Sequence, residues 1–180
     1  MTVTRLGNDF YRQDVLVVAR RLVGMVLCCA NGSGVTRRRI TEVEAYGGES
    51  DSASHARAGR TKRTETMYLA GGHAYVYLCY GIHHMLNVVT GPADVAQAVL
   101  IRGVEGLPGP GRLTKALGIT LADNRVDLRT SARLWIEDDG SGAHEVAESP
   151  RIGISYASET DQARPWRFSL ELGAAHPDAS

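Results

Sequence analysis

Two segments with the pattern of a β-hairpin constrain the fold of this chain more than any other feature of its sequence. In the first, residues 25–30 and 35–46 flank the turn Asn-Gly-Ser-Gly, and in the second, residues 73–89 carry Gly81 near the tip. Turns of this kind between β-branched and aromatic residues are typical of antiparallel neighbours. The sheet is therefore expected to be mainly antiparallel.

Short strands and two helices complete the expected architecture. Asp14 precedes apolar residues spaced three and four apart, and Gly24 closes the segment, which indicates an N-capped amphipathic helix. Because strands dominate and short loops connect them, the sequence predicts an α+β fold. A second, short helix is predicted at 113–117, a polar loop at 47–66, and further strands at 94–104, 133–137, 151–155 and 166–172.

Length and composition narrow the class of protein. A chain of 180 residues, 43% of them hydrophobic, is expected to fold as one domain over 1–180 and to bury roughly 70% of its extended-chain surface. Its longest uncharged apolar run, 22–30, is too short to span a bilayer, and no secretory segment follows Met1. The odd number of cysteines, with Cys28 and Cys29 adjacent, argues against a disulfide framework. We therefore expect a reducing, cytoplasmic location.

The motifs indicate no cofactor and no metal. Cys79, His83 and His84 have the chemistry of ligands, yet their spacing matches no usual zinc site. Neither a Walker loop nor the dinucleotide glycine pattern occurs in the sequence. Cys28 and Cys29 lie in an apolar run, where a thiol behaves as a small hydrophobic group.

The charges are unevenly distributed. The net charge is zero, but residues 1–120 carry 14 basic and 9 acidic side chains, whereas residues 121–180 carry 6 and 11. Arginine outnumbers lysine 18 to 2, which suits bidentate phosphate contacts and is equally the result of a GC-rich genome. The segment 55–63 holds four cations and either follows a phosphate backbone or is an ordinary solvated loop.

The segment 42–46 forms the first candidate for chemistry. In an extended strand Glu42, Glu44 and Tyr46 share one face, with the two carboxylates about 6.6 to 6.8 Å apart. One interpretation is a solvated hairpin face. The other is a general base positioned by its strand.

The tyrosines of the second hairpin form another candidate. Alternation places Tyr75 and Tyr77 on one face, and Tyr80 falls beside the turn at Gly81. Such tyrosines ordinarily pack within a sheet. An aromatic ring at a hairpin tip also has the shape of a wedge that enters a base stack.

In order along the chain, these segments resemble the alkyladenine DNA glycosylase family, also called the 3-methyladenine or methylpurine DNA glycosylase family. The resemblance runs from about Arg5 to Leu170. The matching stretches are 39–46, His55, 75–81, Asn87, 99–102, 109–113, 151–154 and 165–168.

The resemblance implies a monofunctional base-excision enzyme that flips alkylated or deaminated purines out of duplex DNA and hydrolyses the N-glycosidic bond, leaving an abasic site. The implied fold is a curved antiparallel sheet with a protruding hairpin, like the FMT C-terminal domain. The implied partner is double-stranded DNA with damaged purines, bound by a monomer without any membrane, near the nucleoid of a prokaryote.

The resemblance also assigns roles to residues. Glu44 is the implied base for the water, and Arg102 helps to hold that water. The implied base pocket consists of Tyr46, His55 and Tyr77, with Asn87 as a gate against the guanine amino group. The implied DNA-binding residues are the wedge Tyr80, Met67 and Leu100 near it, and the phosphate contact Arg112. The charge of the segment 55–63, and not the resemblance, adds Arg57, Arg60 and Arg63 as candidate phosphate contacts.

Two other functions remain open from the residues alone. The loop 57–63 and Tyr80 would also serve a module that recognises lesions without cutting. Glu42 and Glu44 have a spacing that falls within the about 6.5 to 9.5 Å of inverting carbohydrate hydrolases.

Overall fold

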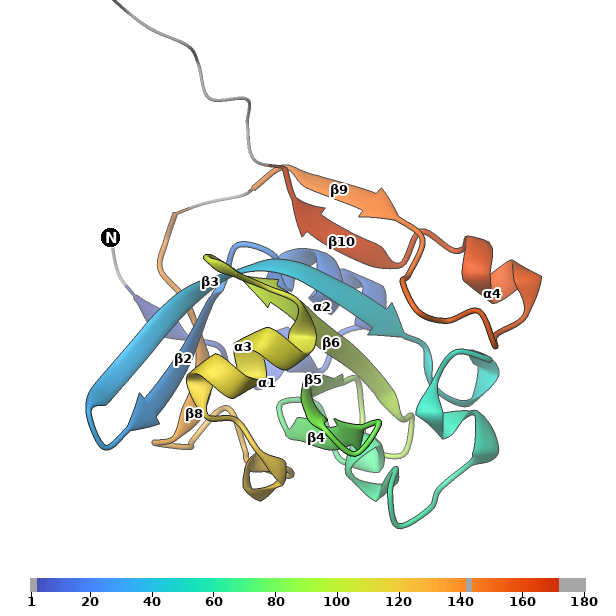
Figure 1. The fold of residues 1–180 in the computed structure, drawn as a ribbon, viewed down its shortest axis with the longest axis horizontal. Helices are drawn as coiled ribbons and strands as arrows, with labels where there is room; N and C mark the ends of the chain where they lie inside the picture. The colour runs from blue at the N-terminus through green and yellow to red at the C-terminus, as the bar shows by residue number, and fades with distance from the viewer. Residues whose placement is uncertain (1–2, 142–143, 172–180) are drawn as a thin grey trace, which may run out of the picture.

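The computed structural model describes residues 3–141 and 144–171, which form a ten-stranded sheet with antiparallel pairing throughout (Figure 1). The strands are β1 (Thr4–Arg5), β2 (Val26–Asn31), β3 (Gly34–Tyr46), β4 (Ala74–Cys79), β5 (His83–Thr90), β6 (Gln97–Val104), β7 (Leu107–Pro108), β8 (Leu134–Asp138), β9 (Val146–Ser149) and β10 (Arg167–Leu170). Their order is β1-β8-β2-β3-β6-β5-β4, with β10 on β3, β9 on β10 and β7 on β6.

Short helices connect these strands. They are the α-helices α1 (Asn8–Tyr11), α2 (Val15–Leu22), α3 (Pro110–Leu117) and α4 (Glu159–Ala163), and the 3₁₀ helices η1 (Gly48–Ser50), η2 (His55–Ala58), η3 (Glu65–Tyr68) and η4 (Leu121–Asp123). Helix α2 packs on β3 and β6, and α3 packs on β5 and β6. The buried side chains of both helices join one apolar core with those of the sheet.

Strand β3 organises the sheet because it changes partners along its length. Its first half pairs with β2, and its second half lies between β6 and β10. The register with β6 shifts between Ile40 and Glu42 and again between Glu42 and Val43. Such irregularities bend a strand and re-aim its side chains. The residues from Glu42 to Tyr46 are thereby enclosed between two neighbouring strands.

A second, smaller apolar cluster holds the segment 47–68 against the sheet. Ala56 of η2 and Met67 of η3 pack with Tyr75 of β4 and Ala98 of β6. This cluster matters for function because it fixes His55 of η2 beside the tyrosines of β4.

The α+β class, the mainly antiparallel sheet, both hairpins and both helices are confirmed. The helix predicted after Asp14 begins there because the Asp14 carboxylate accepts a hydrogen bond from the Leu16 N–H at 2.9 Å. The likeness to the FMT C-terminal domain and the extent of one domain over 1–180 stay predictions.

The strand predicted at 151–155 is wrong. The backbone turns there, with Gly153 at φ 76° and the Ala157 N–H donating to the Ile154 carbonyl. Arg151 directs its side chain into a buried ion pair, and the Ile152 N–H donates to a side chain rather than to a neighbouring strand. Of the two alternating isoleucines, Ile154 is buried and Ile152 is exposed, so the alternation here does not mark a strand.

Other differences concern boundaries. The strand predicted at 94–104 begins at Gln97, because Asp94 and Ala96 adopt positive φ angles. The loop predicted at 47–66 contains helical turns, and β1, β9, α1 and α4 were not predicted. The last strand ends at Leu170, and Leu172 of the prediction lies outside the described residues. No helix in the described part of the chain is long and apolar enough to cross a membrane.

Gly48 supplies a test of how tightly the 47–68 segment is built. It has φ +85°, and a Cβ at this position would lie 2.7 Å from the Val95 carbonyl oxygen. Gly48→Ala is expected to lower the free energy of unfolding by about 1–3 kcal/mol, since both the backbone conformation and the contact oppose a side chain. Gly32→Ala is the control, because a Cβ there meets no atom within 4 Å. Equal urea midpoints for the two variants would contradict this view of the segment.

Candidate active site

Glu44 lies on β3 between β6 and β10, and its side chain is 0% exposed. Three donors from separate parts of the chain hold its carboxylate. The Tyr46 hydroxyl donates to Oε2 at 2.9 Å, and the backbone N–H of Ile152 donates to Oε1 at 2.7 Å. Arg102 of β6 places Nη1 3.4 Å from Oε1. The interpretation of this segment as a solvated hairpin face is therefore wrong for Glu44.

Opposing effects set the ionisation of Glu44. Burial raises the pKa of Glu44, and this effect outweighs Arg102, the Ile152 N–H and the Tyr46 hydroxyl, each of which lowers the pKa. Burial also raises the pKa of Tyr46, so its phenol keeps the proton that it donates. A buried carboxylate whose pKa is shifted upward, yet which retains cationic and neutral donors, has the properties of a proton acceptor.

Glu42 has a different environment from Glu44. Its carboxylate binds Arg102 Nε at 3.2 Å and Arg167 Nη1 at 3.0 Å, and it stays partly exposed. Both carboxylates thus share one guanidinium instead of facing each other across an open groove. This arrangement gives no support to a carbohydrate hydrolase with Glu42 and Glu44 as acid and base.

Two adjoining cavities lie beside Glu44. The inner cavity has a volume of about 40 Å³ and the outer, open one about 600 Å³. Both are lined by Tyr46, His55, Tyr77 and Tyr156. Glu44 lines neither cavity, but Tyr46, Arg102 and Ile152, which all contact its carboxylate, line the outer one. The carboxylate therefore lies directly behind the cavity wall.

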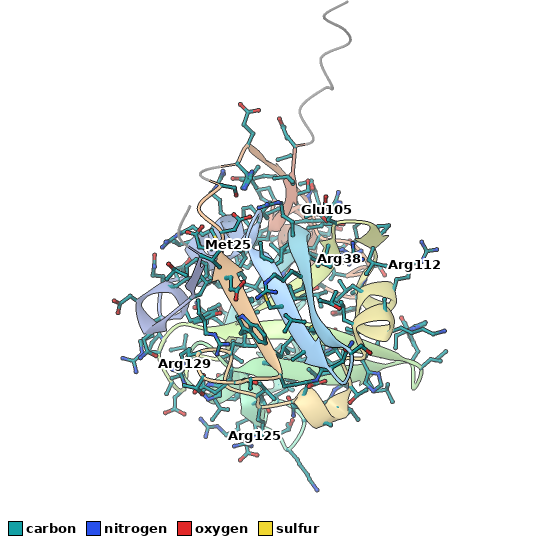
Figure 2. The ribbon with its side chains drawn as sticks, turned by 90° about the vertical axis from the view of Figure 1, so that its left-hand side faces the viewer. Met25, Arg38, Glu105, Arg112, Arg125 and Arg129 are labelled. Atoms are coloured by element: carbon teal, nitrogen blue, oxygen red, sulfur yellow. The ribbon has the colours of Figure 1, made fainter. Side chains whose placement is uncertain are left out.

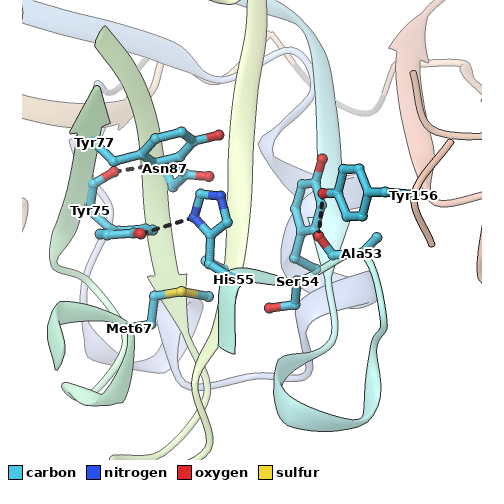
Figure 3. A pocket seen from close by; sticks show the side chains of 10 residues that line it. Ala53, Ser54, His55, Met67, Tyr75, Tyr77, Asn87 and Tyr156 are labelled. Atoms are coloured by element: carbon cyan, nitrogen blue, oxygen red, sulfur yellow. Dashed lines mark hydrogen bonds between the residues drawn. The ribbon is translucent and has the colours of Figure 1, made fainter. Parts of the chain in front are cut away.

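His55 and two tyrosines form one side of this site (Figure 3). The His55 ring lies edge-on to Tyr77, with ring centroids 4.5 Å apart, and its Nδ1 is 3.0 Å from the Tyr75 hydroxyl. Burial lowers the pKa of His55 to about 4, with smaller contributions from Arg63 and Arg57. The imidazole is therefore neutral at pH 7 and can accept as well as donate a hydrogen bond.

Asn87 and Met67 line the inner cavity, and Figure 3 shows Asn87 beside Tyr77 and Met67 below Tyr75. The Asn87 amide donates to the backbone oxygens of Tyr75 at 3.1 Å and of Met85 at 3.4 Å. With both donors directed at the backbone, its carbonyl oxygen is the group left for a ligand. Met67 is buried in the second cluster, away from the hairpin tip.

The β4–β5 hairpin presents apolar groups to solvent at its tip. Tyr80 is 91% exposed at φ 50°, and Ile82 is 71% exposed. By contrast, Tyr75 is buried and Tyr77 half-buried, so the interpretation of all three tyrosines as sheet core is wrong for Tyr80. Tyr80 lines the rim of the outer cavity, and Leu100 of β6 lines its interior.

The predicted phosphate contacts are only partly brought together. Arg57 and Arg63 line the outer cavity, and their guanidinium groups lie over Tyr156 at 4.9 Å and over Tyr77 at 5.5 Å. Arg60 instead pairs with Asp94 and lies over Tyr68 at 4.4 Å. Arg112 is exposed on α3, at the edge of the molecule in Figure 2.

Sequence reasoning assigned no role to three residues of this site. Tyr156 lines both cavities and donates to the Ala53 carbonyl at 2.8 Å. Ile152 supplies a backbone donor to Glu44, and Arg151 lies beside it. The resemblance to the family included the segment 151–154, but it assigned no role to any residue of this segment.

The groups present have the chemistry for proton transfer and stacking. Within the residues that the structure describes, no group of three His, Cys, Asp or Glu side chains is placed to hold a metal ion. Cys79 and His83 face each other across the hairpin, and His84 pairs with Leu78. The site consists of a carboxylate, several phenols, one neutral imidazole and guanidinium groups.

The sequence matches known proteins along most of its length. The model of the methylpurine-DNA glycosylase (MPG) family matches residues 9–108 and 106–173. A protein of Clostridium perfringens (strain SM101 / Type A) is 40% identical, with 93% of this chain and 96% of the relative covered. A protein of Anaeromyxobacter dehalogenans (strain 2CP-C) is 45% identical, with 94% of this chain and 85% of the relative covered. A protein of Myxococcus xanthus is 46% identical, with 91% of this chain and 88% of the relative covered. All three carry the name "Putative 3-methyladenine DNA glycosylase".

The family model and the relatives define the class as a hydrolase that acts on N-glycosyl bonds. The chain belongs to the methylpurine-DNA glycosylase family. The predicted resemblance, enzyme class and link to DNA repair are thereby confirmed, whereas the roles of individual residues stay predictions.

The lowered pKa of His55 predicts a measurable pH dependence of stability. Below its ordinary pKa of about 6.5, His55 takes up a proton in the unfolded chain but not in the folded one until about pH 4. Stability is thus lost as pH falls through this window, on the order of 1–2 kcal/mol at pH 5 after allowance for solvent screening.

His55→Gln removes this contribution, so its free energy of unfolding should change less between pH 7 and pH 5 than that of the wild type. His83→Gln is the control, because this side chain is exposed on the hairpin. Urea titrations at both pH values measure the difference. A His55→Gln variant with the full wild-type loss would show that His55 is not buried in its neutral form.

Proposed function

We propose that this protein is a monofunctional DNA glycosylase that removes alkylated or deaminated purines from duplex DNA. The observation that carries the proposal is the position of Glu44 directly behind the wall of an aromatic cavity, beneath a hairpin with an exposed aromatic tip. The relatives' name, 3-methyladenine DNA glycosylase, supports the same class of substrate.

DNA binding places the hairpin tip in the minor groove. Tyr80 enters the base stack, and the damaged nucleotide leaves the duplex. The exposure of Tyr80 supports this role, since a packed ring could not move into a stack. Arg57 and Arg63 at the cavity contact DNA phosphates, and Arg112 contacts the DNA backbone farther away. Arg60 contacts a phosphate once its ion pair with Asp94 has broken.

The flipped base stacks between Tyr46, His55 and Tyr77. A cationic alkylated purine is attracted to such rings by about 0.5 to 2 kcal/mol, and more when water is excluded. Asn87, held by the two hydrogen bonds that its amide donates to the backbone, acts as a steric gate that leaves no room for the amino group of guanine. Met67 and Leu100 support the pocket from behind.

Glu44 then activates the water that attacks the sugar. The bond to the base breaks through an oxocarbenium-like state, which a carboxylate stabilises while it accepts the proton of the water. A carboxylate offers about four acceptor sites, and the hydrogen bonds from Tyr46 and Ile152 occupy two of them, with Arg102 in an ion pair beside them. Arg102 holds the water against a remaining site. Because Glu44 lies behind the wall, substrate binding must displace one wall side chain slightly to admit that water.

The proposed hydrolysis yields an abasic site and the free base, and it leaves the strand intact. The sequence contains two lysines, Lys62 and Lys115, and neither lines the inner or the outer cavity. An imine-forming strand cleavage therefore has no amine at the site.

Glu44→Gln is expected to bind lesion duplexes within a few-fold of wild-type affinity, yet to lower the single-turnover excision rate by about 10²–10⁴-fold. The amide keeps the shape of the side chain but cannot take a proton. The assay uses duplexes with one hypoxanthine or 3-methyladenine. Glu65→Gln, which removes an exposed carboxylate, is the matched control. Full activity of Glu44→Gln would remove Glu44 from the role of base. Binding without cutting by the wild type would favour a recognition module.

Tyr80→Ala is expected to weaken binding to lesion DNA about tenfold, since base stacking on an aromatic ring contributes about 1–3 kcal/mol. The single-turnover rate at saturating enzyme should fall less than the affinity does. Fluorescence anisotropy gives the affinity, and Val17→Ala, an exposed apolar site on α2, is the control. Unchanged affinity of the Tyr80 variant would contradict the proposed wedge.

A further inference from the structure

Arg151 and Asp51 form an ion pair that is 0% exposed on both sides. Arg151 Nη1 lies 2.6 Å from Asp51 Oδ2, and Nη2 lies 2.9 Å from Oδ1, which is the bidentate geometry. Removing two charges from water is expensive, and an apolar pair of the same volume is often as stable. Stability alone therefore gives a weak reason for this pair.

The pair ties together the backbone segments around the site. Arg151 also donates to the carbonyl oxygens of Ala45 at 2.9 Å and Asp161 at 3.3 Å. Asp51 accepts from the N–H groups of Gly47 and Ala53, both at 3.0 Å. The end of β3, the turn after it and helix α4 are thus joined through one guanidinium, which the loop before α4 carries.

The same guanidinium is directly linked to two of the three donors of Glu44. Its carbon lies 4.9 Å from the centroid of Tyr46, whose hydroxyl donates to Oε2, and Trp166 covers it at 5.1 Å. The other donor, the N–H of Ile152, belongs to the peptide that follows Arg151 itself. The third donor, Arg102 of β6, reaches Glu44 without passing through Arg151.

We infer that Arg151, fixed by Asp51, is a positioning residue that keeps Glu44 ionised by orienting the Tyr46 hydroxyl and the Ile152 N–H toward it. Arg151 makes no hydrogen bond or close ion pair with the Glu44 carboxylate, although its charge favours the same ionised form from farther away, and the positioning acts through these two donors. The inference rests on the proposed function, because an ionised Glu44 matters only if it serves as the base.

The electrostatic surroundings of Glu44 come from several elements. Burial raises its pKa, the two oriented donors and Arg102 lower it, and Glu42 raises it. Weakening two donors while burial stays unchanged must raise the pKa of Glu44 further. Glu42 and Tyr46 of β3 face Glu44 from its own strand. Arg102 of β6, and Ile152 with Arg151 of the 151–152 loop, face it from the neighbouring elements. Arg167 of β10 forms an ion pair with Glu42 and so compensates its charge.

The decisive variant is Arg151→Lys, which keeps the charge but cannot bind Asp51 in a bidentate manner and stacks poorly on Tyr46. Single-turnover excision is measured from pH 5 to pH 9 with saturating enzyme. We expect the acidic limb of the pH–rate profile to move at least one pH unit higher, with about a tenfold lower rate below the limb. The Kd for an uncleavable abasic-analogue duplex should stay within about twofold. A uniform loss at every pH would indicate a merely structural role and overturn the inference.

Arg129→Lys is the matched control. Arg129 also binds an aspartate with two nitrogens, at 2.7 Å and 2.8 Å to Asp127, and it lines neither cavity. This variant should lose stability without any shift of the pH profile. A double variant, Asp51→Asn with Arg151→Gln, removes both buried charges and covers the case in which Arg151→Lys fails to fold; it should show the same shift.

A second measurement separates this inference from the proposed function. Carbon-13 NMR titration of the Glu44 carboxyl in the free protein reports its ionisation without any DNA. We expect a higher pKa of Glu44 in Arg151→Lys than in the wild type. An unchanged titration overturns the positioning role, even if excision is intact. If the titration shifts in Arg151→Lys but the wild type excises no base, the positioning role stands and the proposed function is rejected.

Discussion

The structure depends on a carboxylate that is kept out of water and held by donors. An isolated charge in such a place would cost many kcal/mol, so Glu44 can exist there only because Tyr46, Ile152 and Arg102 supply hydrogen bonds or charge. These donors lie on β3, on the 151–152 loop and on β6. The sheet order β10-β3-β6 brings these parts of the chain to one point. Much of the fold around β3 can be understood as the support of this single group.

Local patterns in the sequence predicted those parts of the fold that depend on neighbouring residues. The turns at residues 31–34 and at Gly81 determine hairpins because backbone sterics act over a few residues. The exposure of Tyr80 follows from the same local argument. The resemblance to a family then supplied Glu44, Arg102 and the pocket residues, which alternation alone left open between a solvated face and a site.

Long-range pairings could not be predicted in the same way. Ile152 donates to Glu44 across 108 positions of the chain, and Arg151 binds Asp51 across 100. A local hydrophobic pattern contains no information about partners so far apart in the sequence. For this reason the apolar alternation of 151–155 predicted a strand that does not form. The burial of Glu44 was missed for the same reason, since the enclosing strands β6 and β10 are distant in sequence. A charged residue that alternates with apolar ones looks exposed until its neighbours on the sheet are known.

The contrast between the hairpin tip and the pocket follows from what each must do. Tyr80 adopts a left-handed backbone conformation that is costly for a residue with a side chain, and its ring is almost fully exposed. The strain directs the ring away from the sheet, where nothing competes with a base stack for it. Behind the pocket, the Asp51–Arg151 pair does the opposite, because it fixes polar groups at the expense of an easier apolar core. A side chain such as methionine could fill the same space, but it has no donors for the Ala45 and Asp161 carbonyls. The loop before α4 would then lose the guanidinium that joins it to β3 and α4, and the Ile152 N–H would lose the direction that a buried carboxylate requires.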